Sequence, residues 1–355
     1  MTVSGGRIRV LVVDDSALMR RVIWGLLEQD PGILVVGSAV DGLDAVEKVR
    51  ELKPDVVTLD VEMPRLDGLQ TLGFLMSESP VACVMLSAYT PRGADTTLKA
   101  LDYGAVDFVQ KPSGALSLDM ERVREELLAK VRVASTIDLK RLPFRPGESS
   151  GQKLLLQPKP MAAPADHGSI VAIGTSTGGP RALSMLIPAL PPDLPAPVVV
   201  VQHMSAGFTR SLAQRLDRES RIRVKEAESG EPILAGMVYL APGDWHFSVQ
   251  RVGGQPRVCL DRRPPQLGVR PCADYLFESV ADAYGSKAVG VVLTGMGRDG
   301  AQGLKAMKAY KAHVIAQDEA SSVVYGMPKA AALSGCVDQV LPLDRIAPAI
   351  VELLP

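Results

Sequence analysis

Four short apolar runs in the first third of the chain are followed by polar side chains that carry a charge or a hydroxyl group. Helix-like patterns, such as residues 16–27 and 43–52, alternate with these runs. This alternation predicts a βαβ succession and therefore an α/β fold with a doubly wound parallel sheet. The runs are residues 8–13, 56–59, 81–86 and 108–109, and the polar residues that follow them are Asp14, Asp15, Asp60, Ser87 and Lys111.

The shared position of these polar residues predicts a common site. In an open parallel sheet, ligands bind in the crevice at the carboxyl ends of the strands. We therefore expect three carboxylates, a hydroxyl and a lysine to meet at one edge of the sheet. Such a set of groups predicts a cation and phosphate centre.

The length of the chain and a proline-rich stretch indicate two domains. The 355 residues are too many for one ordinary hydrophobic core. Residues 134–167 lose the apolar periodicity and gather prolines, which is typical of an extended linker. We expect a first domain at residues 7–133, a linker at residues 134–167 and a second domain at residues 168–355.

Apolar strand-like runs return after the linker and alternate with helical stretches, which predicts a second α/β domain. Residues 233–250 differ, because strand-like segments flank the turn Ala241-Pro242-Gly243-Asp244. They predict an antiparallel hairpin on the main sheet. The strand-like runs are residues 170–174, 198–202, 289–294 and 314–317, and the helical stretches are residues 181–186, 301–308 and 328–333.

The composition narrows the class of protein. A formal net charge of -1 argues against a nucleic-acid partner, because phosphate contacts need a basic face. Basic residues cluster at 218–225 and 257–270, but acidic residues are interspersed, and we interpret both clusters as solvated surface. The four cysteines form no Cys-x-x-Cys pair, no apolar stretch approaches the roughly 20 residues that cross a bilayer, and the N-terminus lacks a signal pattern. We expect a soluble cytoplasmic protein without membrane insertion.

The first site has the groups that a phosphoryl-accepting carboxylate needs. Magnesium is usually held by one or two carboxylates together with waters, which Asp14, Asp15 and Asp60 would supply. Asp60 would also be the nucleophile, Lys111 would balance the new charge, and the Ser87 hydroxyl would donate to the phosphoryl group. Lys111 precedes Pro112, and a cis bond there would aim the lysine inward. Taken singly, an Asp-Asp pair is more often a helix N-cap, so the joint spacing carries the prediction.

The motifs of the first domain resemble the receiver domain of two-component response regulators, a flavodoxin-like fold. The resemblance covers about residues 7–130 and includes Val12-Val13-Asp14-Asp15-Ser16, Asp60-Val61-Glu62-Met63-Pro64, Leu86-Ser87-Ala88 and Gln110-Lys111-Pro112. It implies phosphorylation of Asp60 by a histidine kinase of the chemotaxis type, with Mg²⁺ near Asp14, Asp15, Asp60 and the backbone of Glu62. It also implies a conformational switch through Ser87, Phe108 and Lys111.

The second domain opens with a Gly-x-Ser-x-Gly turn between an apolar strand and a helix start at Pro180. This layout exposes a serine on a sharp turn where backbone amides can also receive an oxyanion, which makes Ser176 the candidate nucleophile. A phosphate-binding glycine turn and a simple tight βα connection remain alternatives.

A serine nucleophile needs a general base and an orienting carboxylate. Of the four histidines, His203 alone ends an apolar strand in the same way as Ser176, although a lone histidine is more often structural. Asp299 follows another strand in a glycine-rich loop, where its alternative role is an Asx turn or a helix N-cap. The chain order Ser176, His203, Asp299 differs from that of α/β-hydrolases, which weakens a lipase interpretation.

Four motifs of the second domain resemble the catalytic domain of the chemotaxis protein-glutamate methylesterases, the CheB family. They are Gly-Thr-Ser-Thr-Gly-Gly-Pro, Gln-His-Met-Ser-Ala-Gly-Phe-Thr, Leu-Ala-Pro-Gly-Asp-Trp-His and Leu-Thr-Gly-Met-Gly-Arg-Asp-Gly, and the order of domains also agrees. The resemblance implies a Rossmann-like catalytic domain with Met296 at the oxyanion. It implies hydrolysis of glutamate γ-methyl esters on methyl-accepting chemoreceptors, deamidation of receptor glutamines, no cofactor for the esterase chemistry and a monomeric protein.

Two other functions fit part of the pattern. The second domain would be a phosphorylation-dependent adaptor if it had lost catalysis, although all three triad residues are present. It would be a general serine esterase if it acted on free small esters. A DNA-binding output is weaker, because no helix-turn-helix pattern with a basic recognition face follows the linker.

Overall fold

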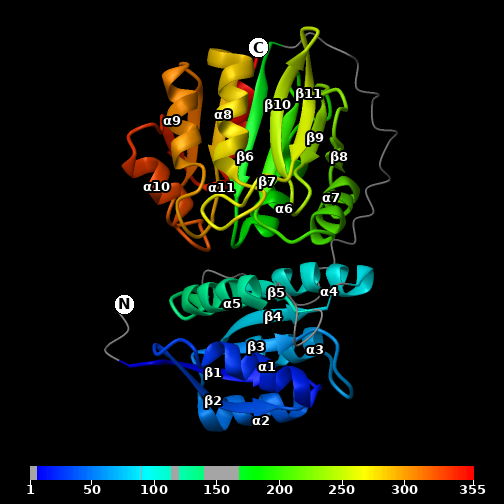
Figure 1. The fold of residues 1–355 in the computed structure, drawn as a ribbon, viewed down its shortest axis with the longest axis vertical. Coiled ribbons are helices and arrows are strands. Elements are labelled where there is room, and N and C mark those ends of the chain that lie inside the picture. Colours follow the sequence, from blue (N-terminus) through cyan, green and yellow to red (C-terminus); the bar gives the residue numbers. More distant parts are fainter. Residues whose placement is uncertain (1–5, 89, 113–119, 140–167) are drawn as a thin grey trace. The chain divides into compact units, whose positions relative to one another are not determined.

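The computed structural model of the protein describes residues 6–88, 90–112, 120–139 and 168–355. The chain divides into two compact units, Met1–Gly151 and Gln152–Pro355 (Figure 1). Residues 140–167, most of the segment expected as a linker, lie outside the described residues. None of the helices in the described parts combines the length and the apolar character that a membrane crossing requires.

The first unit is a five-stranded parallel sheet in the order β2-β1-β3-β4-β5, which is the flavodoxin-like order. Helix α1 contacts α5, whereas α3 contacts both α2 and α4, as in a doubly wound sheet. The strands are β1 (Ile8–Val13), β2 (Ile33–Ala39), β3 (Val56–Asp60), β4 (Ala82–Ser87) and β5 (Asp107–Gln110), and the helices are α1 (Ala17–Leu27), α2 (Gly42–Leu52), α3 (Gly68–Glu78), α4 (Pro91–Asp102) and α5 (Met120–Ala134).

Local sequence explains where these elements begin and end. Strands β3 and β4 are buried along their whole length, so they are continuous apolar runs rather than alternating ones. Ser16 and Asp41 accept hydrogen bonds from the first-turn amides of α1 and α2. Asp67 and Gln70 form a reciprocal capping box at the start of α3.

The second unit contains a seven-stranded parallel sheet in the order β14-β13-β12-β6-β7-β9-β8 and a separate two-stranded sheet, β10-β11. Both units are therefore α/β, as predicted. The strands are β6 (Ile170–Thr175), β7 (Val198–Gln202), β8 (Arg223–Glu226), β9 (Met237–Leu240), β10 (His246–Val252), β11 (Gln255–Asp261), β12 (Ala288–Val292), β13 (His313–Gln317) and β14 (Gln339–Leu341), and the α-helices are α6 (Gly179–Ala189), α7 (Phe208–Glu219), α8 (Ala273–Tyr284), α9 (Ala301–Ala309), α10 (Met327–Leu333) and α11 (Leu343–Glu352).

The hairpin expected at residues 233–250 was wrong. Strand β9 joins the main sheet in parallel with β7 and β8, and β10 pairs antiparallel with β11 instead. The hairpin turn is Gly253-Gly254, where both residues have positive φ (59° and 83°), a conformation that favours glycine. Residues 241–244 connect the main sheet to the hairpin.

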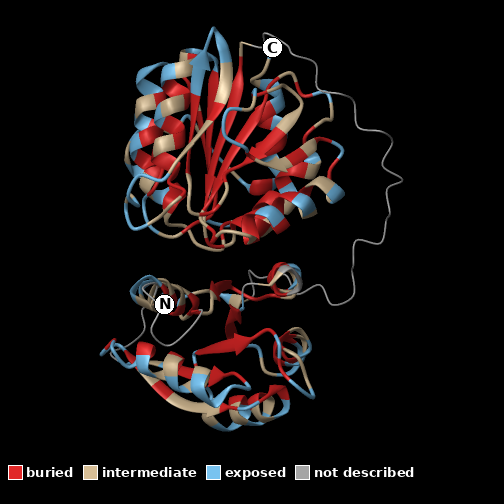
Figure 2. Cartoon of the chain, turned by 45° about the vertical axis from the view of Figure 1, so that its right-hand side comes forward, coloured by how far each residue is buried: buried red, intermediate tan, exposed pale blue. Residues whose placement is uncertain are grey.

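The strand order of the second unit determines where its site lies. Figure 2 shows the buried residues concentrated in the strands of the large parallel sheet of each unit. From β6, the chain adds strands first on the β7 side and later on the β12 side, so the order reverses at β6. Ligands of doubly wound folds bind at such a switch point, outside the carboxyl ends of the strands. Ser176, His203 and Asp299 follow β6, β7 and β12.

Candidate active site and candidate phosphorylation site

Ser176 lies in the turn between β6 and α6 and is half-buried. Gly178, two residues later, has φ 78° and is the N-cap of α6, a left-handed conformation that glycine adopts without strain. The turn is fixed from both neighbouring strands. The Thr294 carbonyl accepts from the Ser176 amide (3.1 Å), and the Gln202 side-chain amide donates to the carbonyls of Ser176 (2.9 Å) and His203 (3.0 Å).

His203 and Asp299 are in direct contact, with 2.7 Å between His203 Nε2 and Asp299 Oδ2. Among the described residues, the other ring nitrogen, Nδ1, makes no hydrogen bond, and neither does the Ser176 hydroxyl. The structure thus pairs the predicted base with the predicted carboxylate and leaves serine and histidine without a mutual hydrogen bond. Catalytic hydrogen bonds that are long in a free enzyme commonly tighten when substrate binds.

Asp299 is held at the N-terminus of helix α8. Its carboxylate accepts from the backbone amides of Ala273 (2.6 Å) and Asp274 (3.0 Å), from its neighbour Gly300 (2.8 Å) and from the Cys272 thiol (3.0 Å). A helix N-terminus stabilises a negative charge. Burial raises the pKa of Asp299, but the hydrogen bond and charge of His203, followed by the bonds from Cys272 and Ala273, outweigh it and lower the pKa to about 2. Asp299 is therefore a permanently charged partner for His203.

Met296 follows a glycine that packs directly on the serine. A Cβ atom added to Gly295 would lie 2.8 Å from Ser176 Cβ, so only glycine fits there. The Met296 backbone N–H makes no hydrogen bond within the described chain, which leaves it able to donate to an oxyanion. An unpaired amide next to Ser176 is what the oxyanion role implied by the family resemblance requires of Met296.

The first unit brings Asp14, Asp60 and Lys111 together at the carboxyl ends of its strands. Lys111 Nζ lies 2.6 Å from Asp14 Oδ2 and 2.7 Å from Asp60 Oδ2. The Lys111 amide donates to the Ser87 carbonyl (2.8 Å) and continues the β4-β5 pairing. This pairing already directs the lysine, and the Lys111–Pro112 bond, considered as cis above, is not cis.

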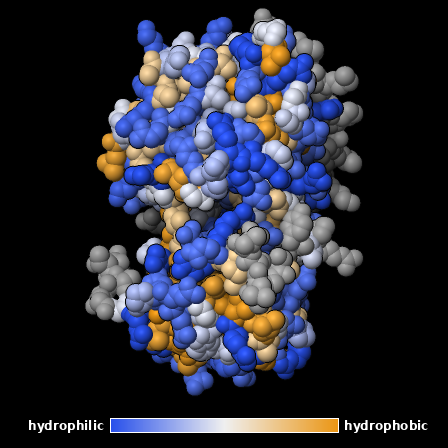
Figure 3. All heavy atoms as spheres, in the orientation of Figure 1, coloured by the Kyte–Doolittle hydropathy of each residue, from blue (hydrophilic) through white to orange (hydrophobic). Residues whose placement is uncertain are grey.

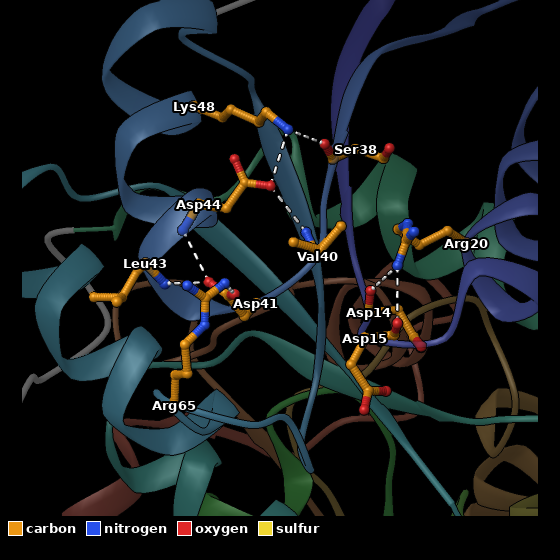
Figure 4. A network of polar contacts seen from close by, with 10 residues as sticks. All are labelled: Asp14, Asp15, Arg20, Ser38, Val40, Asp41, Leu43, Asp44, Lys48 and Arg65. Carbon is orange, nitrogen blue, oxygen red and sulfur yellow. Dashed lines mark hydrogen bonds and ion pairs between the residues drawn. The ribbon is translucent and has the colours of Figure 1, made fainter.

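The acidic cluster fits a divalent cation. Asp14, Asp15 and Asp60 each offer a carboxylate oxygen, and these oxygens all lie within 4.8 Å of one another. Asp14 Oδ2 is buried and pairs with Lys111 but accepts no hydrogen bond of good geometry, so it has room for a further ligand contact. Figure 4 shows Arg20 donating to the backbone carbonyls of Asp14 (2.8 Å) and Asp15 (3.0 Å), which fixes the loop that carries both carboxylates. Hard oxygen ligands of this kind suit Mg²⁺.

Asp60 is the last residue of β3 and is 3% exposed. Its pKa is raised to about 6, because burial and, to a lesser degree, the charge of Asp14 outweigh the lowering effect of Lys111. The Glu62 backbone amide reaches Asp60 Oδ1 at 3.4 Å, whereas the Glu62 side chain is exposed. A cation at this site would favour the ionised carboxylate that a phosphoryl transfer requires.

Two of the three predicted switch residues, Ser87 and Phe108, are buried. The Ser87 hydroxyl donates to the Ala88 carbonyl (3.2 Å), so it is engaged by the backbone rather than by Asp60. The Phe108 ring lies below Lys130, whose Nζ is 5.1 Å from the ring centroid. A switch through these residues would therefore require Ser87 to exchange its hydrogen-bond partner.

Sequence reasoning missed the residues that support the triad. Gln202 and Thr294 end or follow strands beside Ser176, and the strand-end rule that selected His203 applies to both. Cys272 and the first amides of α8 bind Asp299 from a helix 27 to 25 residues earlier in the chain. No spacing pattern in the sequence relates that helix to Asp299.

The fold and the two sites define a response regulator whose output unit has the architecture of a hydrolase. Residues 10–121 match the response regulator receiver domain, and residues 171–350 match the CheB methylesterase domain. The chain therefore belongs to the CheB methylesterase family.

Relatives match the chain along almost its whole length. The protein-glutamate methylesterase/protein-glutamine glutaminase of Symbiobacterium thermophilum is 50% identical over 350 residues (97% of this chain, 96% of the relative). The protein of the same name from Pyrococcus abyssi is 46% identical over 353 residues (99% and 95%). The crystal structure of the Thermotoga maritima CheB methylesterase catalytic domain is 49% identical, with a TM-score of 0.52, and covers 53% of this chain and 99% of that one.

Proposed function

We propose that this protein is a phosphorylation-regulated methylesterase that hydrolyses glutamate γ-methyl esters on methyl-accepting chemoreceptors and deamidates receptor glutamines. The observation that carries the proposal is the His203–Asp299 pair beside the Ser176 turn, at the switch point of the seven-stranded sheet. This sheet lies within the residues that match the CheB methylesterase domain. The four free cysteines fit a reducing cytoplasm, where we place the activity.

The proposed reaction uses the three residues in sequence. Ser176 Oγ attacks the ester carbonyl while a ring nitrogen of His203 takes the hydroxyl proton, and the Met296 amide donates to the oxyanion. The carbon–methoxy bond then breaks, and the histidine returns the proton to give methanol. Water hydrolyses the acyl-serine by the same proton path and leaves a glutamate carboxylate. Asp299 stays ionised throughout and holds the imidazolium, in keeping with its low pKa.

Replacement of the nucleophile tests the esterase. In Ser176→Ala, we expect methanol release from a methylated chemoreceptor fragment to fall by about 10⁴-fold or more, since a triad without its nucleophile keeps only binding and oxyanion stabilisation. Ser286→Ala is the matched control, because Ser286 is exposed at the opposite end of β12. A serine-reactive probe that labels wild type but not Ser176→Ala would also exclude a purely adaptor role. Unchanged methanol release in Ser176→Ala would overturn the assignment.

The first unit is proposed as the regulator. A histidine kinase or a small phosphodonor would phosphorylate Asp60, with Mg²⁺ held by Asp14, Asp15, Asp60 and the Glu62 carbonyl. The cation would neutralise charge on the phosphoryl group, and Lys111 would pair with the phosphoryl oxygens. The convergence of three carboxylates and the raised pKa of Asp60 support this proposal. An added charge of about -1.5 to -2 would shift Ser87, Phe108 and Lys111 and so change substrate access.

Loss of the phosphorylation site tests the regulation. We expect acetyl phosphate with Mg²⁺ to stimulate methanol release by wild type and to leave Asp60→Asn at its basal rate. Asp55→Asn is a control, because Asp55 precedes β3 at the opposite end of the strand. Equal stimulation of wild type and Asp60→Asn would contradict the model.

A further inference from the structure

Two arginines of the loop that joins β11 to α8 are stacked on aromatic rings. The guanidinium carbon of Arg262 lies 4.3 Å from the centroid of the Trp245 ring, and that of Arg263 lies 4.5 Å from the Tyr275 ring. Both arginines are exposed. A stacked guanidinium keeps its N–H edge free for hydrogen bonds in its own plane. We call Trp245, Arg262, Arg263 and Tyr275 the arginine platform.

The loop below the platform is held in one conformation. Arg270 Nη1 donates to the carbonyls of Arg262 and Arg263, both at 3.1 Å. His246 Nε2 donates to the Pro264 carbonyl (3.1 Å), and Gln266 and Val269 exchange two backbone hydrogen bonds. Because these contacts order the loop in advance, little conformational entropy of the loop is lost when a partner binds the platform.

The charge of the platform selects an anionic partner. Residues 261–270 contain three arginines and one carboxylate, that of Asp261, which Arg263 already pairs at 2.6 Å. Among the described residues, Arg262 has no carboxylate partner, so its guanidinium is available. The face of the second unit that includes the β10-β11 sheet is largely hydrophilic in Figure 3. The sequence had indicated only a solvated cluster at 257–270, because the stacking cannot be seen in one dimension.

The platform is connected to the candidate active site through short links. The same loop leads into α8, whose Ala273 amide donates to Asp299. The Asp244 amide, next to Trp245, donates to the Arg270 carbonyl (3.2 Å), and a Cβ atom on Gly243 would lie 2.3 Å from the Ala206 amide, three residues after His203. The platform is therefore built on loops that pack against the chain after His203 and lead into the helix that binds Asp299.

We propose that the arginine platform binds an acidic segment of the protein substrate that flanks the ester being hydrolysed. The inference rests on the proposed function, since each turnover at a glutamate ester leaves a carboxylate on the substrate. Arg262 would bind such a carboxylate through two parallel hydrogen bonds, with Trp245 excluding water from one face. The platform thereby selects substrates by the acidity of the sequence around the ester.

Charge reversal in the full-length protein tests the platform. With a methylated chemoreceptor fragment and acetyl phosphate present, we expect Arg262→Glu to raise KM about tenfold while kcat changes less than KM. Arg262→Lys keeps the positive charge but loses the planar guanidinium, so its KM should lie between those of wild type and Arg262→Glu. Arg221→Glu is the matched control: Arg221 is exposed between α7 and β8, and the same charge change there should alter KM less than twofold.

A binding measurement separates this inference from the proposed function. The probe is a fluorescein-labelled, glutamate-rich helical peptide, and its comparison is the same peptide with glutamine at every glutamate. We expect the glutamate peptide to bind wild type more tightly, to lose about tenfold in affinity with Arg262→Glu and to weaken with added salt. Wild type that binds the peptide but releases no methanol would refute the methylesterase and leave the platform standing. Equal KM values for Arg262→Glu and Arg221→Glu, or displacement of the peptide by inorganic phosphate at equal concentration, would overturn the acidic-segment proposal.

Discussion

Asp60 of the first unit and Asp299 of the second are both 3% exposed, yet their pKa values move in opposite directions. Burial is the largest single influence on each pKa, and in both residues it acts to raise the pKa. The Asp299 carboxylate accepts hydrogen bonds from His203, from a thiol and from three backbone amides, and its pKa falls to about 2. The Asp60 carboxylate pairs with Lys111 and accepts one long hydrogen bond from a backbone amide, and its pKa rises to about 6.

The difference lies in the donors and not in the depth of burial. A carboxylate surrounded by fixed donors remains charged and immobile, as the partner of a catalytic base must be. A carboxylate with too few donors binds a cation favourably, because the cation supplies the positive charge that the protein omits. The same residue type therefore has a constant charge in one unit and a changeable charge in the other.

The largest effect should come from removing the charge of Asp299. In Asp299→Asn, we expect kcat for methanol release to fall by about 10⁴-fold, since an amide cannot stabilise the imidazolium and favours the wrong tautomer of His203. KM should change much less. Steady-state kinetics on the methylated receptor fragment provide the measurement.

Asp274→Asn is the matched control for Asp299. Asp274 is buried at the same helix terminus and accepts from the Gly303 amide, but it does not contact His203. Burial raises its pKa to about 6, so near neutral pH it is mostly a carboxylate, and Asp274→Asn removes a buried charge at the same helix terminus. If both variants lost activity equally, the damage would lie in the helix terminus and not in the charge of Asp299.

The pH dependence of stability should differ between the two units. The folded-state pKa of Asp60 lies above its ordinary 3.8, so the protonated form stabilises the fold at low pH, and this contribution is lost as pH rises through 6. The first unit should lose about 3 kcal/mol between pH 4 and 7 from this residue. Asp299 behaves oppositely: its contribution is present above pH 4 and is lost as pH falls through 2.

Hydrogen exchange with mass spectrometry follows the two units separately. We expect the protection of β3 and β4 to decline between pH 4 and 7 in wild type but not in Asp60→Asn, after correction for intrinsic exchange. The β6 and β7 amides should show no such difference between the two proteins. A wild-type profile that matches Asp60→Asn would show that the Asp60 pKa is not raised.

Magnesium should oppose the destabilisation of the first unit. A cation that binds only the folded state stabilises it by about 1.4 kcal/mol when its free concentration is about ten times its Kd. We expect Mg²⁺ to restore the protection of β3 at pH 7, chelation to remove the gain and Asp14→Asn to abolish it. A gain of the same size in Asp14→Asn would mean that Mg²⁺ binds elsewhere.

Sequence reasoning succeeded where function follows from position along a strand. The ends of β1, β3, β4 and β5 lie within a residue or two of the predicted runs, and Asp14, Asp60 and Lys111 meet as expected. It failed at residues 233–250 because β9 and β10 are both strands, and only the three-dimensional pairing shows that they belong to different sheets.

The surroundings of Asp299 were beyond sequence reasoning for a related reason. An Asx turn or N-cap for the following helix was one alternative for Asp299, and its bond to the Gly300 amide is local. Its other backbone donors belong to α8, whose N-cap residue Cys272 makes no side-chain cap of its own. Asp299 therefore caps a helix that lies far away in the sequence, a contact created by the packing of α8 against α9.

The smallest effect should come from the Cys272 thiol, the weakest of the five donors. Burial and the charge of Asp299 raise the pKa of Cys272, so it stays a neutral S–H donor. We expect Cys272→Ala to lower kcat by about tenfold with little change in KM, because a lost hydrogen bond to a charged acceptor costs about 1.5 kcal/mol. Cys272→Ser retains a donor and should stay within about threefold of wild type. Cys336→Ala removes another buried thiol, one that bonds within the α10 region, and measures the cost of losing a buried thiol that does not contact Asp299. Equal losses of kcat in Cys272→Ala and Cys336→Ala would mean that the Cys272 thiol contributes packing only. The amides of α8 and His203 would then be the groups that keep Asp299 charged.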